Sequence, residues 1–440
     1  MPAASRPSRT PSTRYAWYVV AILTLANVSA NIDQFVLALL VGPIKRDLGI
    51  TDVQMSYLGG PAFALFYVIL GLPIARLADR ANRRNLMAGG VALWSIFTTF
   101  GAVARTFGQL FLTRVGVGVG EATLYAPSVS LLSDYFPRDR RARALSVYSL
   151  GIFLGAGASY VIGGWIVGRL TVNEVWVVPL IGAIHPWQSV FLVVGLPGIA
   201  IALAFLTVRE PERERPLTAT QAPLSVVLRY VWANRRTFGT LSFAFASSAL
   251  VNIAIAFWLA QFFIRTHGLT AQQAGRIQGL LTMSIGTAAV IAGGWLSDWF
   301  VKRGRIDGPL RVGMIGAAGM LVSATAYPLM PTVTLAVIWL AVVNVFAALP
   351  FGAALAAASE IVPPQMRAQG VALYFFVVSL VSRTLGPSAV AWLTDYVFHD
   401  DAKVRYSLVV VNVVGMCAAL ILFSFGLGPY RRTVEARDEQ

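Results

Sequence analysis

Twelve apolar segments of about 20 residues or more constrain what this 440-residue chain can fold into, because a helix of that length crosses the hydrocarbon core of a bilayer. Composition agrees, since 57% of the residues are hydrophobic and only 12% are charged, well below the charged fraction of soluble domains. We therefore expect an all-α membrane protein. The hydropathy pattern predicts transmembrane helices at 16–42, 56–78, 86–104, 108–134, 142–169, 187–207, 239–264, 275–300, 311–330, 332–358, 368–396 and 405–428.

The net charge of +15 arises from 35 Lys and Arg against 20 Asp and Glu. Such a chain could bind nucleic acid, but the positions of the charges indicate another cause. If both termini are cytoplasmic, 24 of the 35 basic residues fall in cytoplasmic segments, seven on the other side and four within or beside spans. This is the positive-inside asymmetry of membrane proteins. We expect a multi-pass protein of the cytoplasmic (inner) membrane of a bacterium, with both termini cytoplasmic, contacts to membrane lipids and no nucleic-acid partner.

The N-terminal segment MPAASRPSRTPSTR is basic and rich in Ser and Pro, as a signal peptide could be. The apolar run after it is too long for a signal sequence, and no small-residue cleavage site closes it. We expect a short tail that leads into a retained helix. The one cysteine, Cys417, lies in an apolar run, which excludes an intramolecular disulfide and a cysteine-based metal cluster.

The longest hydrophilic stretch divides the predicted spans into two sets of six. We expect a cytoplasmic tail at 1–15, a six-helix bundle at 16–207, a cytoplasmic linker at 208–237, a second six-helix bundle at 238–428 and a cytoplasmic tail at 429–440. Short sequences repeat between the halves: Asp79 corresponds to Asp298, and Pro137, Arg141 and Tyr148 correspond to Pro363, Arg367 and Tyr374 at a constant offset of 226 residues. Two pseudo-symmetric halves with a site between them near the midplane form one known transporter architecture.

Arg114 and Glu121 lie in RVGVGVGEATLYAP, inside the fourth predicted span. Ionisable groups at such depth are costly and mark functional sites. The two residues are about 10 Å apart along the helix axis, so they share a face but cannot form a close ion pair. Arg114 can pair with Asp33 of the first span or with a substrate anion, which leaves Glu121 without a permanent counter-charge. Glu121 and Asp33 can each be a proton-coupling site or half of a structural charge pair.

Arg383 is a cation within a span of the second half. It can attract an anionic headgroup or carboxylate across a central cleft, or it can bond a carbonyl group in a helix broken before Pro387. Aromatic and amide side chains can line the same cleft, or they can pack helices and form an interfacial belt. The candidates for substrate binding are Arg114, Arg383, Gln34, Tyr125, Trp258, Asn252 and Asn344.

The loop GLPIARLADRANRR at 71–84 resembles the signature loop of the major facilitator superfamily, G-x-L-x-D-R-x-x-R-R. Four positions match, Asp79, Arg80, Arg83 and Arg84, while Ala75 stands where the family often has glycine. This resemblance implies the fold of that superfamily, with twelve transmembrane helices in two pseudo-symmetric six-helix bundles.

Within the superfamily, the chain is most similar to the spinster-like lysolipid and sphingolipid transporters. Residues 79–84 match their DR-x-NRR loop, and residues 114–122 match a fourth helix that reads R-x-x-x-G-x-G-E-A. The Asp-Arg pair typical of their first helix is here Asp33 and Gln34, so one cation is missing. Anion:cation symporters of the superfamily share a similar fourth-helix motif. In the fifth span, Gly155, Gly157, Gly163 and Gly164 partly resemble the antiporter motif of drug exporters, without its Gly-Pro pair.

The resemblance implies a proton-coupled secondary transporter that alternates access between its two halves, with Glu121 at the position tied to proton coupling. It also implies a cytoplasmic gate, in which Asp79 bonds cations or helix N-termini of the other half while that side is closed. The alternative is that these charges only set the orientation of the helices in the membrane. The gate residues would be Asp79, Arg80, Arg83, Arg84, Asp298 and Arg141.

The sequence contains no H-E-x-x-H, G-x-S-x-G or G-x-x-x-x-G-K motif, which disfavours an enzyme and an ATP-driven pump. We expect a monomer without a cofactor, driven by a proton gradient, whose substrate is an amphipathic or lipid-like organic anion. The alternatives are uptake of a small organic carboxylate, as in an anion:cation symporter, and efflux of a drug or metabolite.

Overall fold

A computed structural model describes residues 12–169, 176–178, 182–211 and 223–438. A few side chains within these ranges, that of Asp79 among them, are not described. Most of the predicted N-terminal tail and residues 212–222 of the predicted linker also lie outside the described ranges. Over the described residues, twelve helical segments are long and apolar enough to cross a membrane, which confirms the predicted number of spans.

The first bundle contains six spans, some of them built from two helices. Its elements are α1 (Thr13–Leu48), α2 (Asp52–Gly59), α3 (Pro61–Arg80), α4 (Arg83–Phe100), the short 3-10 helix η1 (Gly101–Val103), α5 (Phe107–Glu121), α6 (Tyr125–Tyr135), α7 (Arg138–Arg169) and α8 (Pro186–Phe205). Two short antiparallel strands, β1 (Trp176–Val178) and β2 (Gly182–Ile184), stand between α7 and α8 and were not predicted.

The second bundle follows a short helix, α9 (Leu224–Ala233), that the linker prediction missed. Its elements are α10 (Arg235–His267), α11 (Ala271–Leu281), the π-helical turn η2 (Thr282–Gly286), α12 (Thr287–Lys302), α13 (Gly308–Ala326), η3 (Tyr327–Leu329), α14 (Val333–Ala348), α15 (Pro350–Glu360), α16 (Arg367–Trp392), η4 (Leu393–Phe398), η5 (Asp401–Lys403) and α17 (Val404–Asp438).

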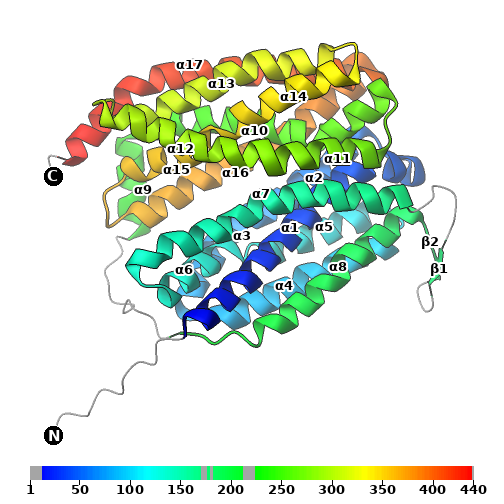
Figure 1. The fold of residues 1–440 in the computed structure, drawn as a ribbon, viewed down its shortest axis with the longest axis horizontal. Coiled ribbons are helices and arrows are strands. Elements are labelled where there is room, and N and C mark those ends of the chain that lie inside the picture. The colour runs from blue at the N-terminus through cyan, green and yellow to red at the C-terminus, as the bar shows by residue number, and fades with distance from the viewer. Residues whose placement is uncertain (1–11, 170–175, 179–181, 212–222, 439–440) are drawn as a thin grey trace, which may run out of the picture.

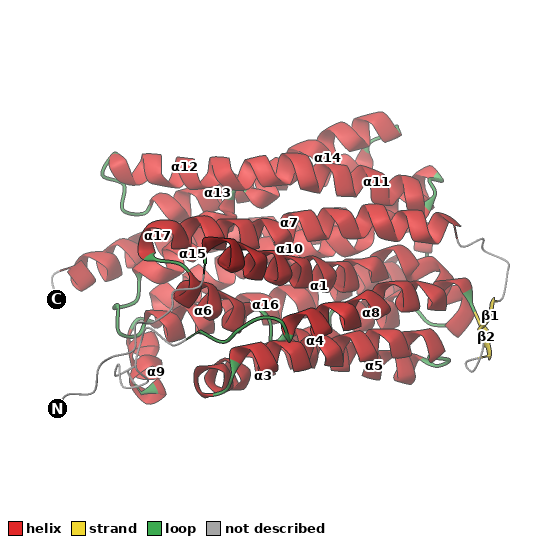
Figure 2. Ribbon diagram, turned by 60° about the horizontal axis from the view of Figure 1, so that its bottom comes forward, coloured by secondary structure: helices red, strands yellow, loops and turns green. Residues whose placement is uncertain are grey.

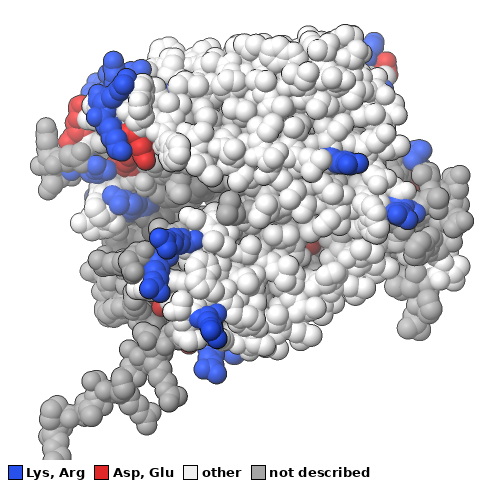
Figure 3. Space-filling model, viewed as in Figure 1, with Lys and Arg blue, Asp and Glu red and all other residues white. Residues whose placement is uncertain are grey.

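The start of α1 and the end of α17 lie at the same end of the molecule, and the β1–β2 hairpin lies at the other (Figure 1). We call these ends the terminal face and the opposite face. The helices run side by side between the two faces (Figure 2), and Figure 1 shows the second bundle above the first. Lys and Arg gather near the two ends of the molecule, most thickly at the terminal face, and leave a largely uncharged belt between (Figure 3). Such a belt suits the hydrocarbon core of a bilayer.

Three spans are interrupted near a proline, which hydropathy does not reveal. The second span is interrupted at Gly60, before Pro61 opens α3, and the tenth is interrupted at Leu349, before Pro350 opens α15. In the fourth span, α5 ends at Glu121 and α6 begins four residues later, two residues before Pro127. Proline lacks the N–H that an α-helix needs, so each break falls where one helical hydrogen bond is already lost.

Two further boundaries differ from the sequence prediction. The last helix, α17, continues to Asp438 with Pro429 inside it, instead of ending at 428 before a tail. The helix α16 runs through Pro387 without a break, so Arg383 does not cap an interrupted helix.

At the terminal face, Asp307 ties α13 to α17 through Arg311 and Arg431, at 3.0 and 2.5 Å. Burial works to raise the pKa of the Asp307 carboxyl, but its bonds to both arginines outweigh this and hold the pKa below its ordinary value.

The two bundles pack most closely between α7 and α11. A Cβ atom added at Gly275 would lie 2.3 Å from the carbonyl oxygen of Tyr160, and one at Gly279 would lie 2.5 Å from that of Gly157. Glycine is therefore required for the backbones to approach this closely. These contacts lie in the half of the molecule nearer the opposite face, since α7 ends there and α11 begins there.

Candidate functional site

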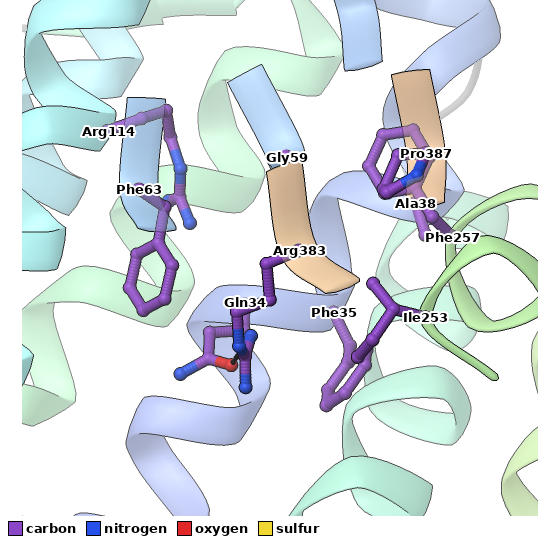
Figure 4. A pocket seen from close by; sticks show the side chains of 10 residues that line it. All are labelled: Gln34, Phe35, Ala38, Gly59, Phe63, Arg114, Ile253, Phe257, Arg383 and Pro387. Carbon is purple, nitrogen blue, oxygen red and sulfur yellow. Dashed lines mark hydrogen bonds between the residues drawn. The ribbon is translucent and has the colours of Figure 1, made fainter. Parts of the chain in front are cut away.

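A cavity lies between the two bundles and is lined by both. Its polar side chains are Gln34 of α1, Arg114 of α5 and Arg383 of α16. The remaining lining is apolar: Phe35, Ala38, Gly59, Phe63, Ile253, Phe257 and Pro387. In Figure 4, Arg383 reaches Gln34 near the middle of the cavity, with Arg114 and Phe63 to one side and Phe257 and Ile253 to the other. Three of the seven predicted substrate-binding residues are thus brought together here.

The amide of Gln34 connects the two bundles. Its Nε2 donates to Oε2 of Glu121 at 2.5 Å, and its Oε1 accepts from Nη1 of Arg383 at 3.0 Å. The Arg383 guanidinium also lies 5.7 Å from the ring centre of Phe63, within the range of a cation–π contact. A chain of hydrogen bonds therefore runs from a carboxyl group in the first bundle to a cation in the second.

Asp33 and Arg114 lie close together, but not as the direct ion pair that the sequence suggested. Nη2 of Arg114 donates to the main-chain oxygen of Asp33 at 3.2 Å, while the Asp33 carboxyl accepts from Thr98 at 2.8 Å. Both side chains are buried, with 1% and 2% of their surface exposed. Among the described residues, Oδ2 of Asp33 and both Nε and Nη1 of Arg114 have no hydrogen-bond partner. Buried polar atoms without partners are costly, which suits a site that awaits a ligand better than a structural brace.

Glu121 is the last residue of α5, and only 3% of its surface is exposed. The next residue, Ala122, still donates to Gly118 as in an α-helix, but Thr123 and Leu124 donate three residues back, to Gly120 and Glu121, so the regular helix ends at Glu121. The carboxyl group is thus placed at a backbone break inside the membrane span. Its Oε1 has no hydrogen-bond partner within the described part of the chain. This position, beside a cavity and without a direct ion pair among the described residues, allows the carboxyl to gain and lose a proton.

The other four predicted substrate-binding residues do not line this cavity. Tyr125 is exposed on α6 and lies near the Tyr148 ring. Trp258 is fully buried and donates to the carbonyl of Pro387 at 2.9 Å, which packs α10 against α16. The amides of Asn252 and Asn344 bond main-chain oxygens of the second bundle, at 3.5 and 2.9 Å. The lining phenylalanines were missed because apolar residues in a span carry no signal of which face they occupy.

The predicted gate residues lie at the terminal face. Arg83 bonds Asp134 of α6 at 2.5 Å and Glu210, which follows the last helix of the first bundle, at 2.7 Å. Arg84 donates from its main-chain nitrogen to the same Glu210. Arg80 and Asp298 are exposed, and Arg141 is half-buried. The side chain of Asp79 lies outside the described residues. Arg83 therefore braces its own bundle here rather than reaching across to the other.

A second cluster of charges joins the bundles at the opposite face. From the sequence, its basic members were counted only as topology signals and its acidic members were not predicted. Asp52, fully buried at the start of α2, accepts from Nη1 and Nη2 of Arg265 at 2.6 and 2.8 Å. Lys45 lies 2.6 Å from Asp52 and 2.8 Å from Asp401. We call Lys45, Asp52, Arg265 and Asp401 the opposite-face ion cluster. Its carboxylates are matched by two cations, so we assign no metal ion to it.

Other contacts between the bundles also lie near this cluster. The main-chain nitrogen of Val53 donates to Asp395 at 2.8 Å, and the hydroxyl of Ser56 donates to that of Ser388 at 3.2 Å. The opposite face is thus closed by a set of bonds between α2 and the elements α16 and η4.

Comparison with known proteins gives the family. The sequence profile of the Major Facilitator Superfamily matches residues 23–387. An MFS-type efflux pump of Mycolicibacterium smegmatis is 28% identical over 437 residues, which are 96% of each chain. Protein spinster of Drosophila melanogaster is 28% identical over 333 residues, which are 73% of this chain but only 52% of the longer relative.

The solved structures include a bacterial homologue of the human lysosomal transporter spinster, in an inward-facing and unoccupied conformation. It is 26% identical, has a TM-score of 0.79, and the match covers 98% of this chain and 99% of that one. The D-xylose–proton symporter, at 17% identity and a TM-score of 0.71, shares the fold. The two six-helix bundles and the family profile agree: this chain belongs to the Major Facilitator Superfamily and, within it, is similar to the spinster-like transporters.

Proposed function

We propose that this protein is a proton-coupled secondary transporter of an amphipathic or lipid-like organic anion. The observation that carries the proposal is the chain from Glu121 through Gln34 to Arg383, because it connects a buried carboxyl group of one bundle to a cation of the other, through an amide that lines the cavity with that cation. A carboxyl group in this setting can carry a proton, and a guanidinium can bind a carboxylate or phosphate. The phenylalanines around them suit an apolar chain.

The proposed mechanism is alternating access by rocking of the two bundles around the cavity. The ion cluster and the α7–α11 contacts support a conformation closed at the opposite face. The similar bacterial structure is inward-facing, which supports assigning the terminal face to the cytoplasm. The surplus of basic residues in the segments on that side supports the same assignment. We place the protein in the inner membrane of a bacterium as a monomer, with the proton gradient as its only energy source and no catalytic activity.

One observation favours a second candidate, which is efflux of an organic molecule. The efflux pump of Mycolicibacterium smegmatis matches this chain over 96% of both lengths. A lipid-like anion and a drug could occupy the same apolar cavity, so the molecule that is transported separates the two functions.

The test uses purified protein in proteoliposomes of known orientation, with an imposed proton gradient. We expect uptake or release of lysophosphatidylglycerol but not of lactate, and no gradient-driven transport in Glu121→Gln, although exchange without a gradient should persist. Glu435→Gln is the matched control, because Glu435 is exposed near the end of α17. Full gradient-driven transport by Glu121→Gln would overturn the proton assignment.

A further inference from the structure

Gln34 contributes an uncharged amide between a carboxyl group and a guanidinium, and this choice of side chain decides the chemistry of the cavity. An arginine here would only donate hydrogen bonds, and its charge would repel Arg383. An amide has a donor at one end and an acceptor at the other. Gln34 can therefore satisfy a carboxylate and a guanidinium together, as its bonds of 2.5 and 3.0 Å do.

The direction of this amide is dictated by its neighbours. Arg383 can only donate and an ionised Glu121 can only accept, so Oε1 of Gln34 must face Arg383 and Nε2 must face Glu121. Both bonds involve a charged group and are stronger than bonds between neutral groups. With Glu121 ionised, the amide is thus held in the orientation that occupies Arg383.

Protonation of Glu121 weakens this arrangement in either of two ways. If the neutral carboxyl still accepts from Nε2, that bond is no longer charge-assisted. If instead its new O–H donates to Gln34, the amide must turn over, and its NH₂ group then faces Arg383, which cannot accept. In both cases Arg383 is held less firmly and becomes available to another acceptor.

Other charged and titratable groups also face Glu121. They are Asp33 on α1, Tyr67 on α3, Arg114 on α5 and Arg383 on α16. Arg114 bonds the main chain of Asp33, and the described residues include no hydrogen bond from it to Glu121. Gln34 is thus the group through which the structure connects Glu121 to the second bundle.

We propose that Gln34 is a positioning residue that couples proton binding at Glu121 to anion binding at Arg383. With Glu121 ionised, Gln34 occupies Arg383; with Glu121 protonated, Arg383 is released to an anionic headgroup. Proton and anion therefore favour each other's binding, and by reciprocity the coupling is that of a symporter. This inference rests on the proposed function and adds the sign of the coupling.

The experiment measures binding of lysophosphatidylglycerol to the purified protein at mildly acidic and mildly alkaline pH, where the charge of this lipid is constant. For the wild type we expect about tenfold tighter binding at acidic pH, the factor for one charge-assisted hydrogen bond. Gln34→Met, which keeps the length of the side chain, should bind the lipid with nearly equal affinity at the two pH values. Its affinity at alkaline pH should rise toward the affinity at acidic pH. Gln34→Leu is a second variant in case the first folds poorly.

Two controls separate this inference from the proposed function. Gln109→Leu removes an exposed amide on α5 and should keep the pH dependence of the wild type. Glu121→Gln should abolish the pH dependence of binding. Adding Gln34→Met to that variant should not change the pH dependence further. If Gln34→Met keeps the full pH dependence while Glu121→Gln loses it, the role of Gln34 is wrong and the proton site stands. If Glu121→Gln also keeps it, or the wild type has none, both proposals fail.

Discussion

At the scale of single residues, the notable feature is that the buried charged groups leave several of their hydrogen-bonding atoms without partners. Asp33, Arg114 and Glu121 are each at least nine-tenths buried, yet each has side-chain atoms without a hydrogen-bond partner among the described residues. A buried ion pair that only braced helices would need most of these atoms satisfied. The arrangement suits groups that change partners as protons and substrate arrive.

Replacement of Arg383 by alanine tests the anion site directly. A guanidinium-to-anion hydrogen bond contributes about 1.5–3 kcal/mol, so we expect binding of lysophosphatidylglycerol to weaken by about 10- to 100-fold. Arg105→Ala is the control, because Arg105 is exposed at the opposite face. Equal affinity in wild type and Arg383→Ala, measured by microscale thermophoresis, would remove Arg383 from the site.

The sequence predicted the charged residues of this site but not their pairing. Arg114, Glu121, Asp33 and Arg383 stand out because ionisable groups are rare in spans. Which of them meet depends on how the helices rotate and tilt, and hydropathy does not encode that. Gln34 could be noticed only as a departure from a family motif, so its contact with Arg383 across the bundles could not be foreseen.

At the scale of helices, glycine determines where the bundles can touch. The glycines of the fifth span face two neighbours: Gly155 and Gly163 approach α1, while Gly157 and Gly164 approach α11. Their partial resemblance to an antiporter motif has a packing explanation, since a Cβ at any of the four would lie within 3.1 Å of a neighbouring atom. Such contacts allow close approach and easy separation of the helices.

A valine at Gly275 should keep the opposite face from closing. Its Cβ would lie 2.3 Å from the carbonyl oxygen of Tyr160, a main-chain atom that cannot rotate away. We expect a longer distance between spin labels at exposed positions Val103 and Leu329, measured in a background in which Cys417 is replaced by serine. Gly294→Val is the control, since nothing lies within 4 Å of a Cβ at Gly294. An unchanged distance in Gly275→Val would show that this contact does not limit closure.

Helix boundaries mark the limit of prediction at this scale. All twelve spans were expected, because length and hydropathy suffice to identify them. The breaks at Gly60, at residues 122–124 and at Leu349 were not, because they lie within apolar sequence. The short helix α9 was missed for another reason: its sequence is apolar, but its 10 residues are too few to give the signal of a membrane span.

At the scale of the whole molecule, contacts between the bundles are concentrated toward one face. The opposite-face ion cluster and the α7–α11 glycines hold that face closed, while Arg83 at the terminal face bonds within its own bundle. Repeats in the sequence predicted two equivalent halves. They could not predict which face is closed, because both conformations use the same sequence and differ by a balance of contacts.

Asp52→Asn should shift this balance toward opening of the opposite face. Removal of one charge from a buried cluster leaves Arg265 and Lys45 poorly matched, at a cost of about 3–5 kcal/mol in the closed state. We expect the Val103–Leu329 distance distribution to gain a long-distance population. Asp400→Asn is the control, because Asp400 caps a turn at the same face and asparagine caps equally well. Identical distributions in Asp52→Asn and wild type would exclude the cluster as a lock.

The most direct test of the account is whether the proton on Glu121 sets the conformation. Spin labels at Leu77 and Val301, exposed near the terminal face on different bundles, report its opening as the pH is changed without substrate. We predict that the wild type changes its distance distribution between mildly acidic and mildly alkaline pH and that Glu121→Gln keeps one distribution throughout. If Glu121→Gln shifts with pH as the wild type does, the proton acts elsewhere and the central claim is wrong.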